Sequence, residues 1–550
     1  VAIARTGGVG SQTSLFVRGG NSDQVLVLVD GVRVNDVASP GGAYDFGNLA
    51  AGGLGKVELL RGSNSVVWGS QAMAGVLAVT SREWNGVEAS AEYGANDSYD
   101  GQVSAGLTGG RYSVGLTGGY TRTDGVSAAA SGTEPDGFRQ WRLAGRARLQ
   151  LVEGLSAVVN GRYADSRADI DGYPAPLYVF ADTPEYQKTR EISGRAGLAY
   201  DSAGFSLAGG FALSDMRRNY YDPTFSPDPN YGTRGRSERA DLTGRYDVSD
   251  AIRLDFGGSS EWTRLSDGAG GHRARLSSAH ALLGWYGDRV KLAAGVRIDD
   301  HSRFGSAWTF GANGSVEIAD GWRARASYGE GFKAPTLYQL FSEYGNTALS
   351  PERSRSYDAG IEKGNRNGPL HFAVTAFRRD TRNLIDYVSC FSSTNALCAD
   401  GRFGFYENVG RARAQGVEVE LGAQASDTLR ASAAYTYLDT ENRTRGDFNF
   451  GNALARRPAH VLTVSADWIT PLHGLTLGAD ARLVGDRFDD AANATRLDGY
   501  VLTTLRASLP ITRAVELYGR VENLTGERYA TAGGYGVPGR AAYGGVRARF

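Results

Sequence analysis

Few side chains in this sequence of 550 residues are spaced for catalysis. The six His residues show no zinc-binding spacing, and the chain holds neither a G-x-S-x-G nucleophile motif nor a Walker A sequence. One G-x-G-x-x-G pattern, at Gly534, Gly536 and Gly539, includes Pro538 and opens no predicted helix. Because Gly is abundant, we interpret that pattern as a chance match rather than a dinucleotide site. The sequence therefore predicts a protein that is not an enzyme and that requires no cofactor.

Acidic side chains in polar stretches are the best candidates for a metal site. Glu134 and Asp136 lie in Thr-Glu-Pro-Asp-Gly, Asp169 and Asp171 in Asp-Ile-Asp-Gly, and Asp222 opens another such stretch. Carboxylate oxygens are hard ligands that suit calcium. However, Asp-x-Asp-Gly without a Glu nine residues after the second Asp is not an EF-hand loop, and acidic residues are common in surface turns. Calcium ligands and ordinary surface turns are both open interpretations.

Two other sets of residues are candidates for structural roles, as a disulfide and as buried ion pairs. Cys390 and Cys398 are the only cysteines, and nothing near them has zinc-ligand spacing, so we expect a local disulfide in an oxidising compartment rather than two free thiols. Arg18, Glu58 and Arg61 lie beside glycines and apolar runs. Charges in such places persist only when paired, so we expect these three to hold one domain against the other.

The first 83 residues have the pattern of a small mixed domain. Residues 25–29 are a continuous apolar run followed at once by Asp30-Gly31, which predicts a buried hairpin. A second apolar stretch, 66–79, is too short and too interrupted by polar residues and glycines to cross a membrane as a helix. We therefore place a domain boundary between residues 83 and 84.

Residues 84–550 alternate between apolar and polar side chains, with turn residues at regular intervals. Residues 103–107 and 112–120, separated by Gly109-Gly110, are one hairpin of this kind. The mean hydropathy of −0.32 and the lack of a continuous apolar run of 18 residues exclude a helical membrane bundle, but barrel strands alternate and keep the mean low. About 21 residues per strand and connection would allow 22 strands. The polar stretches 164–191, 219–239 and 389–408 are the predicted long loops of one rim.

The end of the chain carries the same alternation. Val546, Ala548 and Phe550 share one face and Arg547 and Arg549 the other, as expected of a strand with lipid outside and polar side chains inside. The 59 basic and 60 acidic residues leave a net charge of −1, so no nucleic-acid partner is predicted. The fold class predicted is all-β transmembrane: a 22-stranded antiparallel barrel with the N-terminal domain as a plug in its lumen.

Four motifs of the N-terminal domain occur in the order and spacing of a known family, and three downstream sets of residues resemble further signatures of that family. In the N-terminal domain they are Arg18-Gly19-Gly20-Asn21, residues 25–33, Val57-Glu58-Leu59-Leu60-Arg61-Gly62-Ser63 and Trp68-Gly69-Ser70. Downstream they are Gly331-Phe332-Lys333-Ala334-Pro335 with Leu349-Ser350-Pro351-Glu352, Asn408-Val409-Gly410 with Gly416-Val417-Glu418, and Glu522-Asn523-Leu524-Thr525 with Tyr529. Over essentially its whole length the chain resembles the TonB-dependent outer-membrane transporters.

The resemblance implies a location, partners and a ligand. It implies active import across the bacterial outer membrane, contact with membrane lipid, and coupling to TonB through an N-terminal segment that this sequence does not contain. Within the family the likeness is greatest to cobalamin transport, with a ferric-siderophore receptor as the alternative and an outer-membrane enzyme or a passive porin as less favoured classes. The same resemblance places Glu134, Asp136 and Asp222 where extracellular loops bind calcium.

The ligand site is expected where the apex of the plug faces the long loops. Two Gly-rich plug segments, 7–11 and 36–45, offer backbone donors that can approach a ligand closely. An aromatic ring such as Tyr44 could pack on a flat macrocycle. The predicted ligand contacts are Gly8, Val9, Gly10, Ser11, Ser39, Gly42, Tyr44 and Asp45.

Overall fold

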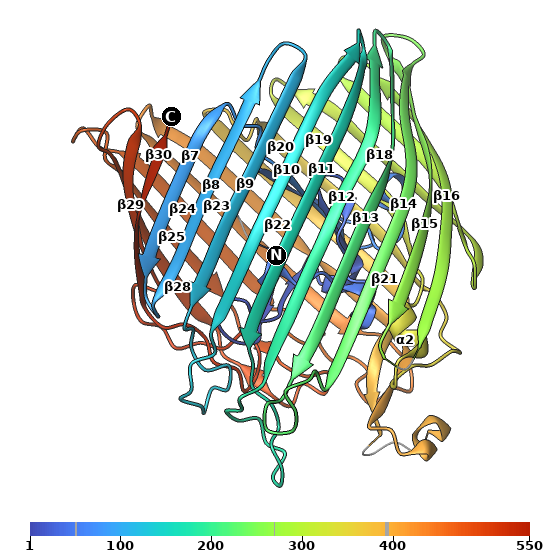
Figure 1. Ribbon diagram of the computed structural model, residues 1–550. Helices are drawn as coiled ribbons and strands as arrows, with labels where there is room; N and C mark the ends of the chain where they lie inside the picture. The colour runs from blue at the N-terminus through green and yellow to red at the C-terminus, as the bar shows by residue number, and fades with distance from the viewer. Residues whose placement is uncertain (50–51, 269, 391–394) are drawn as a thin grey trace.

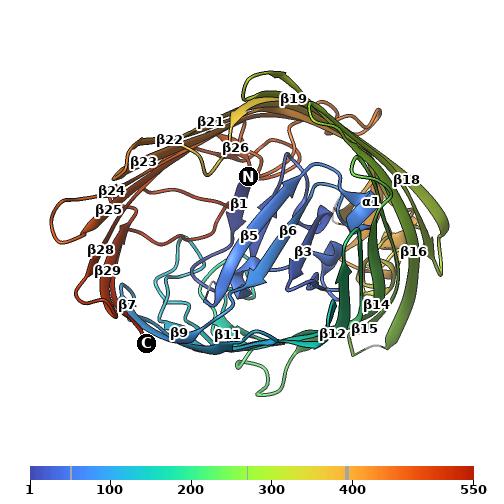
Figure 2. The ribbon, with the colours of Figure 1, turned by 90° about the horizontal axis from the view of Figure 1, so that it is seen from above.

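The computed structural model describes residues 1–49, 52–268, 270–390 and 395–550. Within these residues, 22 strands close into an antiparallel barrel around the N-terminal domain (Figures 1 and 2). The barrel strands are β7 (Gly86–Gly94), β8 (Ser98–Thr108), β9 (Tyr112–Thr123), β10 (Phe138–Val152), β11 (Leu155–Asp169), β12 (Tyr186–Ser202), β13 (Phe205–Tyr221), β14 (Tyr231–Asp247), β15 (Ile252–Ser266), β16 (Gly271–Tyr286), β17 (Val290–His301), β18 (Gly305–Ala319), β19 (Trp322–Lys333), β20 (Glu352–Gly364), β21 (Leu370–Ser389), β22 (Gly404–Ser426), β23 (Leu429–Asn442), β24 (His460–Ile469), β25 (Thr476–Val484), β28 (Tyr500–Pro510), β29 (Val515–Glu522) and β30 (Ala541–Arg549). The predicted fold class is confirmed.

Alternating side chains explain why these strands form a closed wall. In β30, Val546 is 39% exposed and Phe550, just beyond the strand, is 78% exposed, whereas Arg547 donates to Glu516 of β29 at 2.8 Å. Arg549 donates to Glu88 of β7 at 2.6 Å, in the register where β30 pairs with β7 and closes the barrel. Opposite charges on neighbouring strands thus support the closing ladder. No helix in the described ranges is long and apolar enough to cross a membrane.

The strands extend further than the sequence predicted. A crossing needs about 9 to 11 residues, but β21 has 20 residues and β22 has 23. The predicted loops 164–191, 219–239 and 389–408 are correspondingly too long, because strand pairing leaves only 170–185, 222–230 and 390–403 between strands. Backbone hydrogen bonds between strands do not require apolar side chains, so the ladders continue past the apolar band.

Long and short connections lie at opposite rims. The long-loop rim carries 124–137, 170–185, 222–230, 334–351, 390–403, 443–459, 485–499 and 523–540, while the short-turn rim carries connections such as 153–154, 203–204, 320–321 and 365–369. In Figure 1 the long-loop rim is at the bottom and the C-terminus is near the top. The long loops contain α2 (Leu337–Phe341), η5 (Ala396–Asp400), β26 (Arg487–Phe488) and β27 (Arg496–Leu497). Cys390 and Cys398 form the predicted disulfide in the long-loop rim.

The plug is built on a four-stranded sheet of order β4-β3-β6-β5. Its strands are β3 (Val25–Val29), β4 (Val32–Arg33), β5 (Leu54–Arg61) and β6 (Gly75–Ser81). A two-stranded sheet of β1 (Ala2–Arg5) and β2 (Thr13–Phe16), the helix α1 (Ser65–Trp68), and the turns η1 (Ser22–Gln24), η2 (Pro40–Gly42) and η3 (Phe46–Asn48) complete it. Figure 2 shows this sheet inside the ring of barrel strands.

The predicted hairpin is present. Asp30 and Gly31 adopt positive φ angles of 49° and 80°, which a tight turn between β3 and β4 requires, and Val29 pairs with Val32. The Asp30 side chain also accepts hydrogen bonds from the backbone N–H and the hydroxyl of Ser81 at 2.8 and 2.6 Å. The turn therefore fixes the end of β6, after which the chain passes to β7 in the wall.

Candidate functional site

Arg18 anchors the plug to the inner wall. Its Nε and Nη2 donate to the two carboxylate oxygens of Glu418 on β22 at 3.2 and 2.7 Å, and its Nη1 reaches Asp358 on β20 at 3.4 Å. The side chains of Arg18 and Glu418 are 7% and 6% exposed. A Cβ on the adjoining Gly19 would lie 2.7 Å from the Ala414 side chain, so glycine lets this turn press against the wall. A two-point guanidinium–carboxylate pair is among the stronger contacts in proteins.

Arg61, at the end of β5, uses the same acceptor. Its Nη1 lies 3.0 Å from Glu418, and its other nitrogen pairs with Glu420. Glu58 differs from the expectation, because its carboxylate pairs with Lys56 of the same plug strand at 2.7 Å. Residues 56 and 58 share one face of β5 and residues 59 and 61 the other, so the strand's period of two turns Glu58 away from the contacts that Arg61 makes.

A second buried cluster, whose role was not predicted from the sequence, lies nearer the long-loop rim. Lys333 of β19 pairs with Asp23 of the plug at 2.7 Å and with Glu352 of β20 at 3.5 Å. Gln24 donates to the other oxygen of Glu352 at 2.8 Å. Lys333 and Glu352 are each 1% exposed at the side chain. Both belong to motifs on which the family resemblance rests, so their position in those motifs was the available signal.

The structure brings the two predicted ligand-binding segments together. Asp45 accepts a hydrogen bond from the backbone N–H of Thr13 and another from that of Gly47, each at 2.9 Å. The first of these ties the end of segment 36–45 to the chain just after segment 7–11. Burial raises the pKa of Asp45, although these hydrogen bonds oppose the shift. Among the eight predicted contacts, Val9 is 42% exposed, Ser11 and Asp45 are half-buried, and the rest are buried: Gly8, Gly10, Ser39, Gly42 and Tyr44.

Tyr44 is buried, so the prediction that its ring lies open to a ligand at the plug apex is wrong. Its side chain is 1% exposed within the plug core, and its hydroxyl donates to Glu191 of β12 at 3.3 Å. The ring also makes an edge contact with Phe46 at 5.4 Å between centroids. A tyrosine that is buried with its hydroxyl paired supports the loop from below. Direct contact between Tyr44 and a ligand stays a prediction.

A long loop covers part of the apex. Ala38 of the plug packs in one buried apolar cluster with Leu337, Tyr338 and Leu340 from α2. Next to this cluster a small cavity of 100 Å³ lies between Gly42 of the plug and the chain at Thr336. The loop 334–351 is therefore the part of the barrel that a ligand at the apex would meet first.

The acidic candidates lie in neighbouring loops but make no metal site as they stand. Asp136 accepts from the backbone N–H of Ala128 at 2.6 Å, and burial together with nearby Asp171 raises the pKa of Asp136 to about 7. Asp222 instead accepts from both the backbone and the hydroxyl of Thr224. Among the described residues no group of three or more His, Cys, Asp or Glu could hold a metal ion. Calcium binding by Glu134, Asp136 and Asp222 stays a prediction.

A closed barrel with long loops at one rim, short turns at the other and a folded plug anchored inside defines a plugged outer-membrane transporter. Residues 1–76 match the TonB-dependent receptor plug domain, and residues 203–524 match the TonB-dependent receptor-like β-barrel. The chain belongs to the TonB-dependent receptor family. It is an outer-membrane protein of a family that carries out TonB-dependent transport, and the family is one of receptors and transporters rather than of enzymes.

Several solved structures share the fold over almost the whole chain. A variant of the ferric enterobactin receptor PfeA from Pseudomonas aeruginosa is 19% identical with a TM-score of 0.81, covering 99% of this chain and 93% of that chain. The siderophore receptor PirA from Pseudomonas aeruginosa is 18% identical with a TM-score of 0.74, covering 97% and 92%. The FrpB iron transporter from Neisseria meningitidis is 13% identical with a TM-score of 0.82, covering 100% and 95%.

Proposed function

We propose that the protein imports a ferric siderophore across the outer membrane. What supports this choice over cobalamin is that the structures similar over nearly the full chain include a ferric enterobactin receptor, a siderophore receptor and an iron transporter. A passive porin is a weaker interpretation, because the plug is attached to the wall by buried ion pairs at several places.

In the proposed cycle the ferric chelate enters at the long-loop rim and contacts the plug at Val9 and near Pro40, which are exposed there. The loop 334–351 rests on the apex and is joined to the plug through Lys333 and Asp23. A ligand wedged between the apex and this loop would therefore act on the buried cluster that links them. Force applied through TonB then separates the plug from Glu418 and opens a path.

The test is uptake of iron by cells that lack their own ferric-siderophore receptors and express this protein. We expect uptake of radioactive iron presented as a siderophore complex, and we expect it to stop when the proton motive force is dissipated or TonB is deleted. Cyanocobalamin is assayed in parallel as the competing ligand. Uptake of cyanocobalamin with no uptake of any ferric siderophore would replace the proposal, and uptake that persists without TonB would indicate a passive pore.

A further inference from the structure

The outer surface of the barrel carries an arc of basic side chains close to the long-loop rim. In β12 the outward-facing residues from Ile192 to Tyr200 are uncharged, and Ile192 and Leu198 are 43% and 52% exposed. This stretch has the length that crosses a membrane, about 9 residues. The next outward residues toward the long-loop rim are Arg190 and Lys188. Strands β10 to β16, whose long-loop ends are at the bottom of Figure 1, follow the same order. Their basic residues therefore lie just beyond the apolar band, at the level of the lipid head groups.

Strand pairing sets these cations side by side. Three rows cross neighbouring strands on the outward face; they are Arg122, Arg139, Arg167 and Lys188; Arg190, Arg217 and Arg234; and Arg236, Arg264 and Arg273. A fourth row on β20 to β22 consists of Arg353, Arg382 and Arg411. Residues directly opposite each other in an antiparallel pair are about 5 Å apart at Cβ, and like charges there destabilise the pair. The rows are therefore costly unless an anion lies between the side chains.

Carboxylates of the protein offset only part of this charge. The outward ion pairs on β9 to β16 include Arg122–Asp124, Arg167–Asp169, Arg190–Asp165, Arg234–Asp215 and Arg236–Glu238. Four exposed cations of the rows have no carboxylate partner among the described residues: Arg139, Lys188, Arg217 and Arg273. Arg217 lies directly between Arg190 and Arg234. Each of the three rows therefore keeps at least one cation that can bind an anion from outside the protein.

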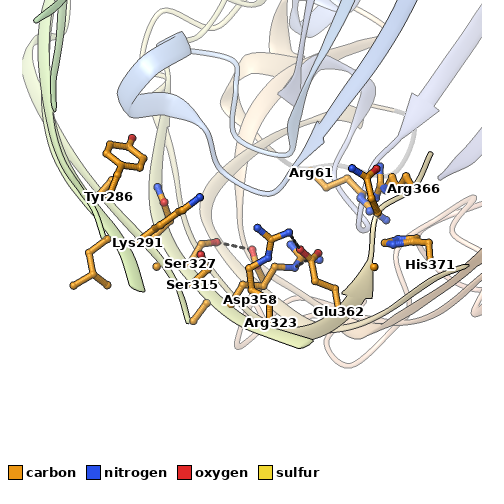
Figure 3. A pocket seen from close by; sticks show the side chains of 18 of the residues that line it. Arg61, Tyr286, Lys291, Ser315, Arg323, Ser327, Asp358, Glu362, Arg366 and His371 are labelled. Atoms are coloured by element: carbon orange, nitrogen blue, oxygen red, sulfur yellow. Dashed lines mark hydrogen bonds and ion pairs between the residues drawn. The ribbon is translucent and has the colours of Figure 1, made fainter. Parts of the chain in front are cut away.

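Arginines on the inward face of the wall have a different environment. Arg323 of β19 pairs with Glu362, the residue directly opposite on β20 (Figure 3). Arg506 and Arg520 lie opposite each other on β28 and β29, yet each has a carboxylate partner of its own. At these inward positions the protein itself supplies the negative charge that the outward rows lack.

The opposite side of the barrel shows that a basic outer surface is not needed to cross the membrane. The outward-facing residues of seven described strands include no Lys, Arg, Asp or Glu; the strands are β24, β25, β28, β29, β30, β7 and β8. These strands cross the same membrane with exposed outward residues such as Tyr93, Trp468 and Val546. The basic arc is therefore a local property of one side of the wall.

We infer that the outward face of β9 to β16 binds the phosphorylated head groups of lipids in the extracellular leaflet of the membrane. A guanidinium group can donate two hydrogen bonds to one phosphate, and a phosphate monoester carries up to two negative charges. A phosphate over a row replaces the repulsion between neighbouring cations with attraction to a shared anion. The acyl chains of the same lipid lie on the adjoining apolar band, which favours a lipid over a soluble anion. The inference does not depend on which ligand is transported.

The experiment uses the full chain, purified in a neutral detergent, with lipid A as the probe. Lipid A that carries two phosphates is compared with the same lipid after its phosphates have been removed, and bound lipid is counted by native mass spectrometry. We expect the protein to bind the bisphosphorylated lipid at least about tenfold more tightly, with an affinity that falls as the salt concentration rises. We also expect this lipid to raise the unfolding temperature, because it binds the folded barrel and relieves repulsion within the rows.

Variants of the unpaired cations locate the binding. Arg217→Gln should weaken binding of the bisphosphorylated lipid about fivefold, the typical effect of one cation close to anionic head groups. A triple variant that also carries Arg139→Gln and Lys188→Gln should weaken it about a hundredfold. Arg445→Gln is the matched control, because Arg445 is an exposed arginine of the long loop 443–459 and belongs to no row. In detergent without lipid A, Arg217→Gln should unfold at a higher temperature than the parent, because one cation between two others has been removed.

Four results would overturn the inference. They are equal binding of lipid A with and without its phosphates, parent-like binding by both Arg217→Gln and the triple variant, displacement of lipid A by inorganic phosphate at the same concentration, and tighter binding of heparin, a soluble polyanion, than of lipid A. A lower unfolding temperature of lipid-free Arg217→Gln would refute the repulsion on which the inference depends. Heat-modifiable migration on a gel shows that each variant has folded, and the single variant carries the test if the triple variant does not fold.

Discussion

Glu418 is the carboxylate on which the attachment of the plug depends most. It accepts two hydrogen bonds from Arg18, at 3.2 and 2.7 Å, and lies 3.0 Å from Arg61. Glu418→Gln keeps the size of the side chain and removes its charge. We expect this change to release the region around both arginines while the barrel itself stays assembled, because no strand pairing depends on the side chain.

The size of the effect follows from burial. Without the charge of Glu418, Arg18 keeps Asp358, at 3.4 Å, as its carboxylate partner, and the Arg18 side chain is 7% exposed. Breaking a buried ion pair by neutralising one partner typically costs about 3–5 kcal/mol. Arg61 adds little to this figure, since it is 22% exposed and retains Glu420. Opening of the anchored turn should therefore become roughly two to four orders of magnitude more frequent.

Hydrogen–deuterium exchange with mass spectrometry measures that opening directly. Peptides that cover residues 17–21 and 59–63 should exchange faster by about the stated factor in Glu418→Gln, while peptides from wall strands keep the parent's rates. Glu58→Gln is the control, because Glu58 is 48% exposed and pairs only with Lys56 at the surface of the plug, where a pair contributes less than about 1 kcal/mol.

Two results would refute this reasoning. One is a parent-like exchange rate around Arg18 in Glu418→Gln. The other is an equal acceleration in Glu58→Gln, which would mean that charge in the lumen matters and the specific anchor does not. Heat-modifiable migration on a gel, unchanged in both variants, shows that the barrel has folded and that the comparison is valid.

Four further outcomes are expected. Thiol titration of the denatured, unreduced protein should find neither Cys390 nor Cys398 free, and Cys398→Ser should increase proteolysis of that loop, since closing a loop of about nine residues contributes roughly 2.5 kcal/mol. Because the pKa of Asp136 is raised from 3.8 to about 7, loop 124–137 should be most protease-resistant below pH 3.8 and lose resistance as the pH rises through 7, and Asp136→Asn should abolish that dependence. Lys333→Met should loosen loop 334–351 to proteolysis, because Asp23 and Glu352 lose their shared cation. In thermal unfolding, Tyr44→Ala should destabilise the plug by about 3–5 kcal/mol and Tyr44→Phe by about 1–3 kcal/mol.

The barrel could be predicted because its wall repeats one simple rule. Every strand must alternate between lipid and lumen, so the period of two is present in each segment, and the terminal Val546 and Phe550 display it clearly. The ends of the strands could not be predicted in the same way. Beyond the membrane no apolar face is needed, and the ladder continues on backbone hydrogen bonds alone, as in β21 and β22.

A site residue could be predicted where the reason for its position lies in neighbouring residues of the sequence, and not where it lies far along the chain. Arg18 and Arg61 could be found because a charge beside tight glycines and apolar residues must be buried, whereas Glu58 looked similar and was separated from them only by its side of β5. The burial of Tyr44 could not be predicted, because it packs in the plug core and the acceptor of its hydroxyl, Glu191, lies 147 positions away in the chain. Long-range partners of this kind leave no pattern in the sequence around them.

The division of forces within the plug explains how it can leave the wall without unfolding. All but two of the buried members of its main apolar cluster belong to the plug itself; the exceptions are Ala212 and Met216 of β13. Beside these apolar contacts, the plug is linked to the wall by buried ion pairs of Arg18, Lys333 and Arg218. An apolar core that opens loses its stabilisation to water, but charges separated in a polar lumen regain hydration, which offsets part of the lost pairing. A pull on the plug therefore needs less free energy to break the ion pairs with the wall than to unfold the plug sheet. The sheet can then move as a unit.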